Sequence, residues 1–277
     1  YQIYGDGENE KSGFSKNPSM SIALLKNALE LVVDLSKELK RDEHRQAKWQ
    51  DIINNLRELP TWEENGKRFL RGAEEDAHGQ QVFGISFSPI YPANGVTLDS
   101  DSVLLAIGLN TVDAVQQWKH HNGTNSFYPA AVRVGYTPEK IMEELHKYAL
   151  HTYPNGFQLD NPHGIENSCT AANTLNEMAC MSVGNKIRLF TVWPKSVDAS
   201  FKKIRTWGAF LISASFRNGV VCGVSVFSEK GRSCTIVNPW KGKSVLLMRS
   251  GKPDEQLQGE ELTFSTSVNE TIILKPL

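Results

Sequence analysis

The sequence has no excess of charge of either sign and no long hydrophobic run. Its 277 residues include 30 Lys and Arg against 31 Asp and Glu, a formal net charge of −1. This balance gives no electrostatic basis for binding a polyanion such as nucleic acid. No apolar stretch approaches the roughly 20 residues that a membrane-spanning helix needs. With 40% hydrophobic and 22% charged residues, the composition is typical of a globular chain with one or two domains.

Cysteine is also scarce. Cys169 and Cys180 fall on one expected helix, separated by 11 positions, and at about 1.5 Å per residue they lie roughly 16 Å apart, too far for a disulfide. Cys222 and Cys234 fall on neighbouring expected strands but not opposite each other. No CxxC or Cys/His spacing typical of zinc is present. The spacing therefore predicts no disulfide between Cys169 and Cys180 or between Cys222 and Cys234, and no zinc site. It does not indicate whether the protein is found in an oxidising or a reducing compartment.

Helical periodicity dominates the first two thirds of the chain. Ser19 to Lys40 carries two adjoining apolar stripes, which predict a helix with neighbours on more than one side. A second helix between Asp42 and Pro60 completes an expected helical hairpin, and Trp62 to Gly72 is typical of a β-hairpin that turns at Asn65-Gly66. Further helices are expected over 99–119, 137–150 and 165–181, with a mixed segment between the first two of these.

The pattern changes near Gly184 to short alternating runs. Asn218-Gly219 joins Ala209–Phe216 to Val220–Phe227 as a hairpin signal. Other strands are expected over 186–193, 233–237, 244–248, 261–266 and 271–275. The sequence therefore predicts an α+β chain, with a helical domain over 1–185 and an antiparallel β-sandwich or β-sheet domain over 186–277.

The most suggestive polar segment is the loop that leads into the last helix, Phe157 to Asn167. It gathers Asp160, His163 and Glu166 beside Asn161-Pro162 and Gly164. Loops fixed at helix ends often carry catalytic side chains. A structural role fits the same segment, with Asp160 and Asn161 capping the helix and Glu166 facing the positive end of its dipole. From these residues alone, the structural role is the simpler interpretation.

Several segments in one order resemble a known enzyme family. They are Phe157-Gln158-Leu159-Asp160, then 177–182, 188–194 and 207–210, and the Asn218-Gly219 hairpin. Together they resemble the C-terminal half of glycoside hydrolase family 95, the inverting α-L-fucosidase family. The resemblance implies part of an (α/α)6 helical barrel followed by a β domain. Because only about five long helices are expected here, the chain looks like the latter part of a larger enzyme, completed by an N-terminal remainder.

The resemblance also implies roles for particular residues. Asp160 stands at the position of the family's aspartate that activates the attacking water, and Glu8 in Gly7-Glu8-Asn9 is the nearest candidate for the general acid, although a solvated loop acid fits Glu8 equally well. His163, Glu166 and Trp62 are expected sugar contacts, and packing within the hairpin is the alternative for Trp62. The expected substrate is an oligosaccharide or polysaccharide, the expected location is secreted or periplasmic, and neither a cofactor nor a metal is expected.

The sequence also departs from the family pattern. Nothing matches the family's asparagine motif, and its histidine-rich segment corresponds at best to 81–92 without a histidine in register. A site that hydrogen-bonds different hydroxyl groups selects a different sugar, so the expected sugar is a terminal α-L-fucosyl group or a related one such as α-L-galactosyl. Two other functions stay open: a carbohydrate-binding relative without catalysis, and an inverting glycoside phosphorylase, in which phosphate replaces water.

Overall fold

The computed structural model describes residues 3–4, 13–14, 16–75, 87–119, 124–160, 162 and 164–277. The chain divides into two compact units, one formed by 1–136 with 144–171 and the other by 137–143 with 172–277. Helices predominate in the first unit and antiparallel sheets in the second, so the mixed α and β class predicted from the sequence is confirmed. Within the part of the chain described, no helix combines the length and the apolar character that a bilayer crossing requires.

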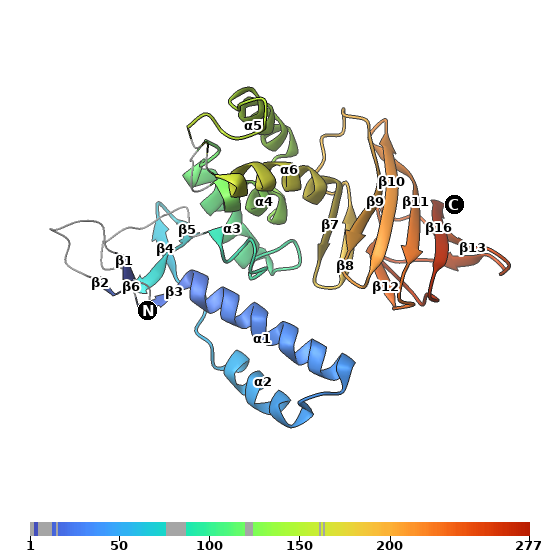
Figure 1. Cartoon of the computed structure of the whole chain (residues 1–277), viewed down its shortest axis with the longest axis horizontal. Helices are drawn as coiled ribbons and strands as arrows, with labels where there is room; N and C mark the ends of the chain where they lie inside the picture. Colours follow the sequence, from blue (N-terminus) through green and yellow to red (C-terminus); the bar gives the residue numbers. More distant parts are fainter. Residues whose placement is uncertain are drawn as a thin grey trace. The chain divides into compact units, whose positions relative to one another are not determined.

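Two helices of the first unit form a helical hairpin (Figure 1). Helix α1 (Ser19–Leu39) ends at Lys40, which adopts a left-handed conformation and donates its N–H to Ser36 O. A short 3-10 turn, η1 (Glu43–Arg45), leads into helix α2 (Gln46–Asn54), which lies beside α1. The expected hairpin is therefore confirmed. Strand β3 (Lys16–Pro18), which precedes α1, pairs with β6 (Ala73–Glu75).

Much of the apolar surface of α1 is exposed. Of its apolar residues, Ile22, Ala23 and Val33 are buried. The exposed large apolar side chains of this helix are Leu24, Leu25, Leu31, Val32, Leu35 and Leu39. The sequence predicted neighbours on more than one side of this helix, and the described residues leave this face uncovered.

The β-hairpin that follows forms as the sequence predicted. Strand β4 (Thr61–Glu64) pairs with β5 (Lys67–Leu70), and the turn residues Asn65 and Gly66 both have positive φ. This conformation is the reason for Asn-Gly in such turns, because glycine adopts it without steric cost. Strand β5 packs on helix α3 (Ser102–Val115), where the buried Leu70 N–H donates to Thr111 Oγ1 at 2.8 Å.

One helix of this unit was missed. Helix α4 (Thr124–Arg133) occupies the segment expected to be mixed. Pro129 lies inside this helix, and because proline disfavours helix interiors, the residue pattern gives little indication of a helix there. Its Phe127 and Tyr128 are fully buried, and Trp118 packs edge-on against both rings, with centroids 4.5 and 5.1 Å away. Burial of these large rings outweighs the local preference against a helix. Helices α5 (Pro138–Leu150) and α6 (Ile165–Ala179) were both expected.

The second unit is a sandwich of two sheets (Figure 1). The six-stranded sheet has the order β14-β13-β16-β11-β10-β9, and the four-stranded sheet has the order β15-β12-β8-β7. The strands are β7 (Cys180–Val183), β8 (Lys186–Leu189), β9 (Ala199–Thr206), β10 (Phe210–Arg217), β11 (Val220–Ser228), β12 (Cys234–Val237), β13 (Val245–Arg249), β14 (Glu255–Leu257), β15 (Glu261–Phe264) and β16 (Glu270–Pro276). All described pairs are antiparallel except β8 with β12, which are parallel.

One hydrophobic core joins the inner faces of both sheets. Along β10 the residues alternate between buried and half-buried, as one face of a sheet packed on another requires. Ile212 and Leu247 of the six-stranded sheet and Ile236 of the four-stranded sheet are all fully buried in this core. The Asn218-Gly219 hairpin between β10 and β11 is confirmed, and helix α6 ends two residues earlier than expected because Cys180 and Met181 begin β7.

All four cysteines are free thiols, so neither Cys169 with Cys180 nor Cys222 with Cys234 forms a disulfide. Cys180 and Cys234 lie in the sandwich core, and burial raises the pKa of each thiol to about 12. A buried thiol of this kind stays protonated and packs as a small apolar side chain. Neither residue therefore offers a nucleophile.

Candidate functional site

The candidate site is a tight loop between α5 and α6. Thr152 and Gln158 form an isolated antiparallel bridge, and Tyr153 N–H donates to Phe157 O at 2.8 Å. The chain reverses at Gly156, which has a positive φ and donates its N–H to Tyr153 O. These backbone hydrogen bonds give the loop a fixed conformation rather than leaving it as an open connection.

The loop brings His151 and Asp160 together. His151 Nε2 and Asp160 Oδ2 are 2.8 Å apart, and the backbone N–H of Leu159 donates to His151 O at 3.1 Å. Because an ionised carboxylate only accepts hydrogen bonds, the imidazole ring donates in this pair. The Asp160 side chain is 62% exposed. Within the described part of the chain, no hydrogen bond engages its other oxygen, Oδ1, so that oxygen can bind a water molecule or a ligand.

Two buried side-chain amides, Gln158 and Asn167, hold the loop in place through hydrogen bonds. Gln158 and Asn167 are 1% and 0% exposed, and Asn167 Nδ2 donates to Gln158 Oε1 at 3.3 Å. Gln158 Nε2 in turn donates to Lys119 O at 3.4 Å. The loop is thus tied both to α6, through Asn167, and to the segment that follows α3. A carboxylate on such a support is fixed in place although it faces solvent.

The structure corrects one interpretation of Asp160. Helix α6 begins at Ile165, directly after Gly164, whose carbonyl oxygen accepts from Asn167 N–H at 3.1 Å. Asp160 lies five positions before that start and binds His151, so it does not cap the helix. Glu166 lies in the first turn of α6, as expected, and is exposed. An acidic residue there interacts favourably with the helix dipole, and its side chain is also accessible to a ligand.

Two of the expected site residues, Glu8 and His163, lie outside the described residues. Trp62 lies on β4, directly opposite Phe69 on β5, and the two rings stack with centroids 4.8 Å apart. The alternative of hairpin packing is therefore confirmed for Trp62. Its role as a sugar contact stays a prediction.

His151 was not predicted as a site residue. A signal for it was available, because Pro154-Asn155-Gly156 stands midway between His151 and Asp160 and is typical of a chain reversal. A reversal at that point places the two side chains on one side of a short hairpin. The pairing would then have followed from the turn chemistry.

The first unit also contains a cavity of about 330 Å³, which lies between α1, the segment before β4, and α3. No sequence pattern predicted it. Its charged lining comprises three cations, Lys26, Arg57 and Arg68, and two acids, Glu58 and Asp101. Arg68 Nη2 donates to Thr61 Oγ1 at 2.9 Å. The apolar lining includes Ile22, Ala23, Leu59, Val103, Leu104 and Ile107. It combines apolar walls with a few polar groups, as small-ligand sites commonly do.

A comparison with protein-family models and with curated proteins found no match to this chain. Among the residues that the structure describes, no group of three or more His, Cys, Asp and Glu side chains is arranged to hold a metal ion.

Proposed function

We propose that this chain supplies the general base, Asp160, of an inverting glycoside hydrolase that removes a terminal α-L-fucosyl or related α-L-galactosyl group from an oligosaccharide or polysaccharide. The observation that carries the proposal is the exposed His151–Asp160 pair on an anchored loop, at the position where the sequence resembles glycoside hydrolase family 95. A general base must reach the attacking water with a fixed carboxylate oxygen. Asp160 Oδ1 meets that requirement, since Oδ2 is held by His151.

In this mechanism Asp160 accepts a proton from the water that attacks the anomeric carbon. His151 holds the carboxylate in one orientation by donating to Oδ2, and it does not touch the substrate. Glu8 is the proposed general acid, and inversion requires its carboxyl group roughly 6.5–9.5 Å from that of Asp160, so that the water fits between the base and the sugar. His163, Glu166 and Trp62 are the proposed sugar contacts.

We further propose that the helices of the first unit belong to an (α/α)6 barrel completed by an N-terminal remainder of the parent protein. The support is α1, which exposes six large apolar side chains along one helix. Full burial of a leucine or valine contributes about 1.5–3 kcal/mol, so additional helices against this face would gain considerable stability. By the same resemblance, the location would be secreted or periplasmic, and the role polysaccharide degradation.

The decisive experiment compares Asp160→Asn with wild type in the full-length protein, with p-nitrophenyl α-L-fucoside and α-L-galactoside as substrates. Loss of the base should lower kcat by about 10²–10⁴-fold, while sugar binding persists because the amide is isosteric. Asp254→Asn, which removes an exposed acid of the second unit, is the matched control and should leave kcat unchanged. NMR of the first product should show the β-anomer, as inversion requires.

Three outcomes would contradict the proposal. Undiminished hydrolysis by Asp160→Asn would remove Asp160 from the mechanism. Sugar binding without turnover by the wild-type full-length protein would favour the binding relative. Release of a sugar 1-phosphate that depends on added phosphate would favour the phosphorylase.

A further inference from the structure

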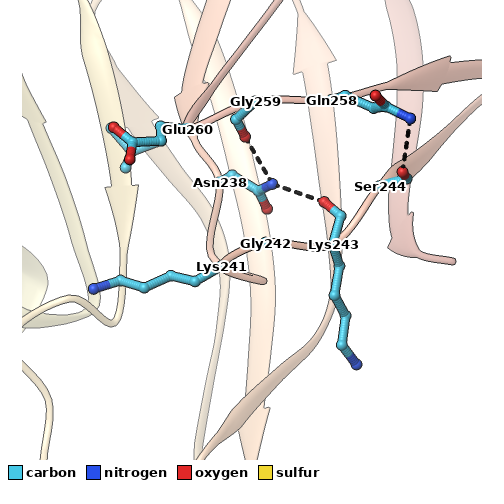
Figure 2. A pocket seen from close by; sticks show the side chains of 9 residues that line it. Asn238, Lys241, Gly242, Lys243, Ser244, Gln258, Gly259 and Glu260 are labelled. Atoms are coloured by element: carbon cyan, nitrogen blue, oxygen red, sulfur yellow. Dashed lines mark hydrogen bonds between the residues drawn. The ribbon is translucent and has the colours of Figure 1, made fainter.

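The second unit contains a cavity of about 580 Å³ that lies apart from the Asp160 loop in the sequence (Figure 2). Two connections form it, 238–244 between β12 and β13 and 258–260 between β14 and β15. Its volume falls within the range of about 300–1,000 Å³ that is common for small-ligand sites. Most of its lining residues carry a polar or charged side chain, although their carbon atoms make up much of the wall. The lining residues are Val237, Asn238, Lys241, Gly242, Lys243, Ser244, Gln258, Gly259 and Glu260.

Asn238 gives this cavity a rigid frame. It is 5% exposed, and its Nδ2 donates to Lys243 O and to Gly259 O, both at 3.0 Å. Its Oδ1 accepts from Trp240 N–H at 3.0 Å, and Asn238 N–H donates to Glu260 O at 2.8 Å. One buried side chain therefore joins the two connections, as Figure 2 shows. The cavity does not depend on a ligand to hold it open.

The charged groups around this frame are not used within the unit. In the described part of the chain, neither Lys241 Nζ, Lys243 Nζ nor the Glu260 carboxylate has a hydrogen bond or ion pair. Figure 2 shows Lys241 and Glu260 extending on one side of the pocket, while Gln258 Nε2 donates to Ser244 Oγ on the other at 3.0 Å. The lining therefore offers two cations, one acceptor-only carboxylate, an amide and a hydroxyl group.

This set of groups points to an acidic saccharide. The two ammonium groups suit carboxylate groups on a ligand, while Glu260, Gln258 and Ser244 suit the hydroxyl groups of a sugar. The lysine side chains leave the 241–243 segment in different directions (Figure 2), so they suit acids on successive sugar units better than one small anion. Glu260 would repel a ligand made only of negative charge. Among the described lining residues there is no aromatic ring, so a neutral sugar would have no surface on which to stack.

We propose that the 238–244 and 258–260 connections form a binding site for an oligosaccharide of uronic acids, separate from the Asp160 site. Lys241 and Lys243 bind carboxylate groups, and Glu260 accepts hydrogen bonds from hydroxyl groups. The site would hold an acidic polysaccharide on the second unit, whatever chemistry the first unit performs.

The test is isothermal titration calorimetry on the full chain with trigalacturonic acid. Neutral galactotriose and sodium sulfate are the comparison ligands. We expect trigalacturonic acid to bind with an affinity that falls as NaCl is raised, because exposed charge pairs are screened. Galactotriose and sulfate should bind at least about tenfold more weakly, a difference of about 1.4 kcal/mol. Because the readout is binding, the result does not depend on whether Asp160 is catalytic.

The variant Lys241→Glu/Lys243→Glu should lower the affinity for trigalacturonic acid at least tenfold. Its matched control is Lys202→Glu/Lys230→Glu, which makes the same charge change at two exposed lysines of the same unit and should retain binding. Circular dichroism checks that both variants fold. Equal loss in the two variants, absence of binding by wild type, or equally tight binding of galactotriose or sulfate would each overturn the proposal.

Discussion

The hydrogen bonds of the buried Asn238 side chain allow a direct test of how the two connections of the second unit are held together. Replacing it with Ala removes three side-chain hydrogen bonds, from Nδ2 to Lys243 O and Gly259 O and from Trp240 N–H to Oδ1. Each such bond contributes about 1 kcal/mol net to stability. The buried Trp240 N–H and two carbonyl groups would also lose their partner. We therefore expect Asn238→Ala to lower the free energy of unfolding by about 3 kcal/mol.

The isosteric variant Asn238→Asp adds a pH dependence whose sign follows from the same contacts. An ionised carboxylate cannot donate to Lys243 O and Gly259 O, and it would be buried beside those two oxygens. Burial and the neighbouring carbonyl groups raise the pKa of such a carboxyl group. The carboxyl group introduced by Asn238→Asp therefore has a higher pKa in the folded state than in the unfolded state, where it is about 3.9. Below about pH 3.9 the carboxyl group is protonated in both states and the variant has its full stability. As the pH rises through the folded-state pKa, this stability is lost. Asn238→Asp should therefore be least stable relative to wild type at neutral pH and should recover towards pH 4.

The assay is urea unfolding of the full chain followed by circular dichroism at pH 4.5 and pH 7.5, with the midpoint compared at constant m-value. Gln256→Ala, which removes an exposed amide on β14, is the control and should change stability by less than about 0.5 kcal/mol. If Asn238→Ala lowers the free energy of unfolding by less than about 1 kcal/mol, the three hydrogen bonds do not contribute as proposed. An equal penalty for Asn238→Asp at both pH values would refute the electrostatic reasoning.

Two further predictions concern the contacts of single side chains. If Asp160 is the proposed general base, His151→Ala in the full-length protein should lower kcat about tenfold with little change in KM, because the Asp160 carboxylate loses its orienting donor. His151→Gln should restore part of the rate. Steady-state kinetics measure both variants, and a change in KM alone would contradict the positioning role. Burial raises the pKa of Glu270, but the Ser267 N–H and the Lys252 ammonium group outweigh burial and hold it below 4.5. Glu270 therefore stabilises the fold above its unfolded-state pKa and loses this effect as the pH falls through the folded-state pKa. The stability gap between wild type and Glu270→Gln should accordingly be widest near neutral pH and narrow below pH 4.5 in urea unfolding, and a gap that widens in acid would contradict this assignment.

The parts of the fold that the sequence predicted are those set by local rules. The hairpin turns at Asn65-Gly66 and Asn218-Gly219 need positive φ at both positions, and the structure has it at all four residues. The missed elements depend on distant contacts. Helix α4 contains Pro129 and forms around buried rings. Strand β9 lies at a sheet edge with exposed charged residues, which obscure the alternating pattern but suit an edge strand.

The candidate site divides in the same way. The Asp160 loop could be located from the sequence because the turn, the acidic residues and the following helix are contiguous. The role of His151 depends on where the chain reverses, and Pro154-Asn155-Gly156 was the local signal for that reversal. The cavity of the second unit could not be located, because its two connections meet only after β12 pairs with β15. No local pattern specifies that pairing.

In both proposed sites, buried neutral side chains hold the backbone segments together, and exposed ionisable side chains are available to bind a ligand. In each, a buried amide holds the segments together, Asn167 with Gln158 beneath the Asp160 loop and Asn238 beneath the cavity of the second unit. A neutral amide can donate to a backbone carbonyl, as Gln158 does to Lys119 O and Asn238 does to Lys243 O and Gly259 O, without the cost of burying a charge. The ionisable groups then remain exposed, where they stay hydrated until a ligand binds. Substitution of the amides should therefore act on stability, and substitution of Asp160 or the cavity lysines on binding or turnover.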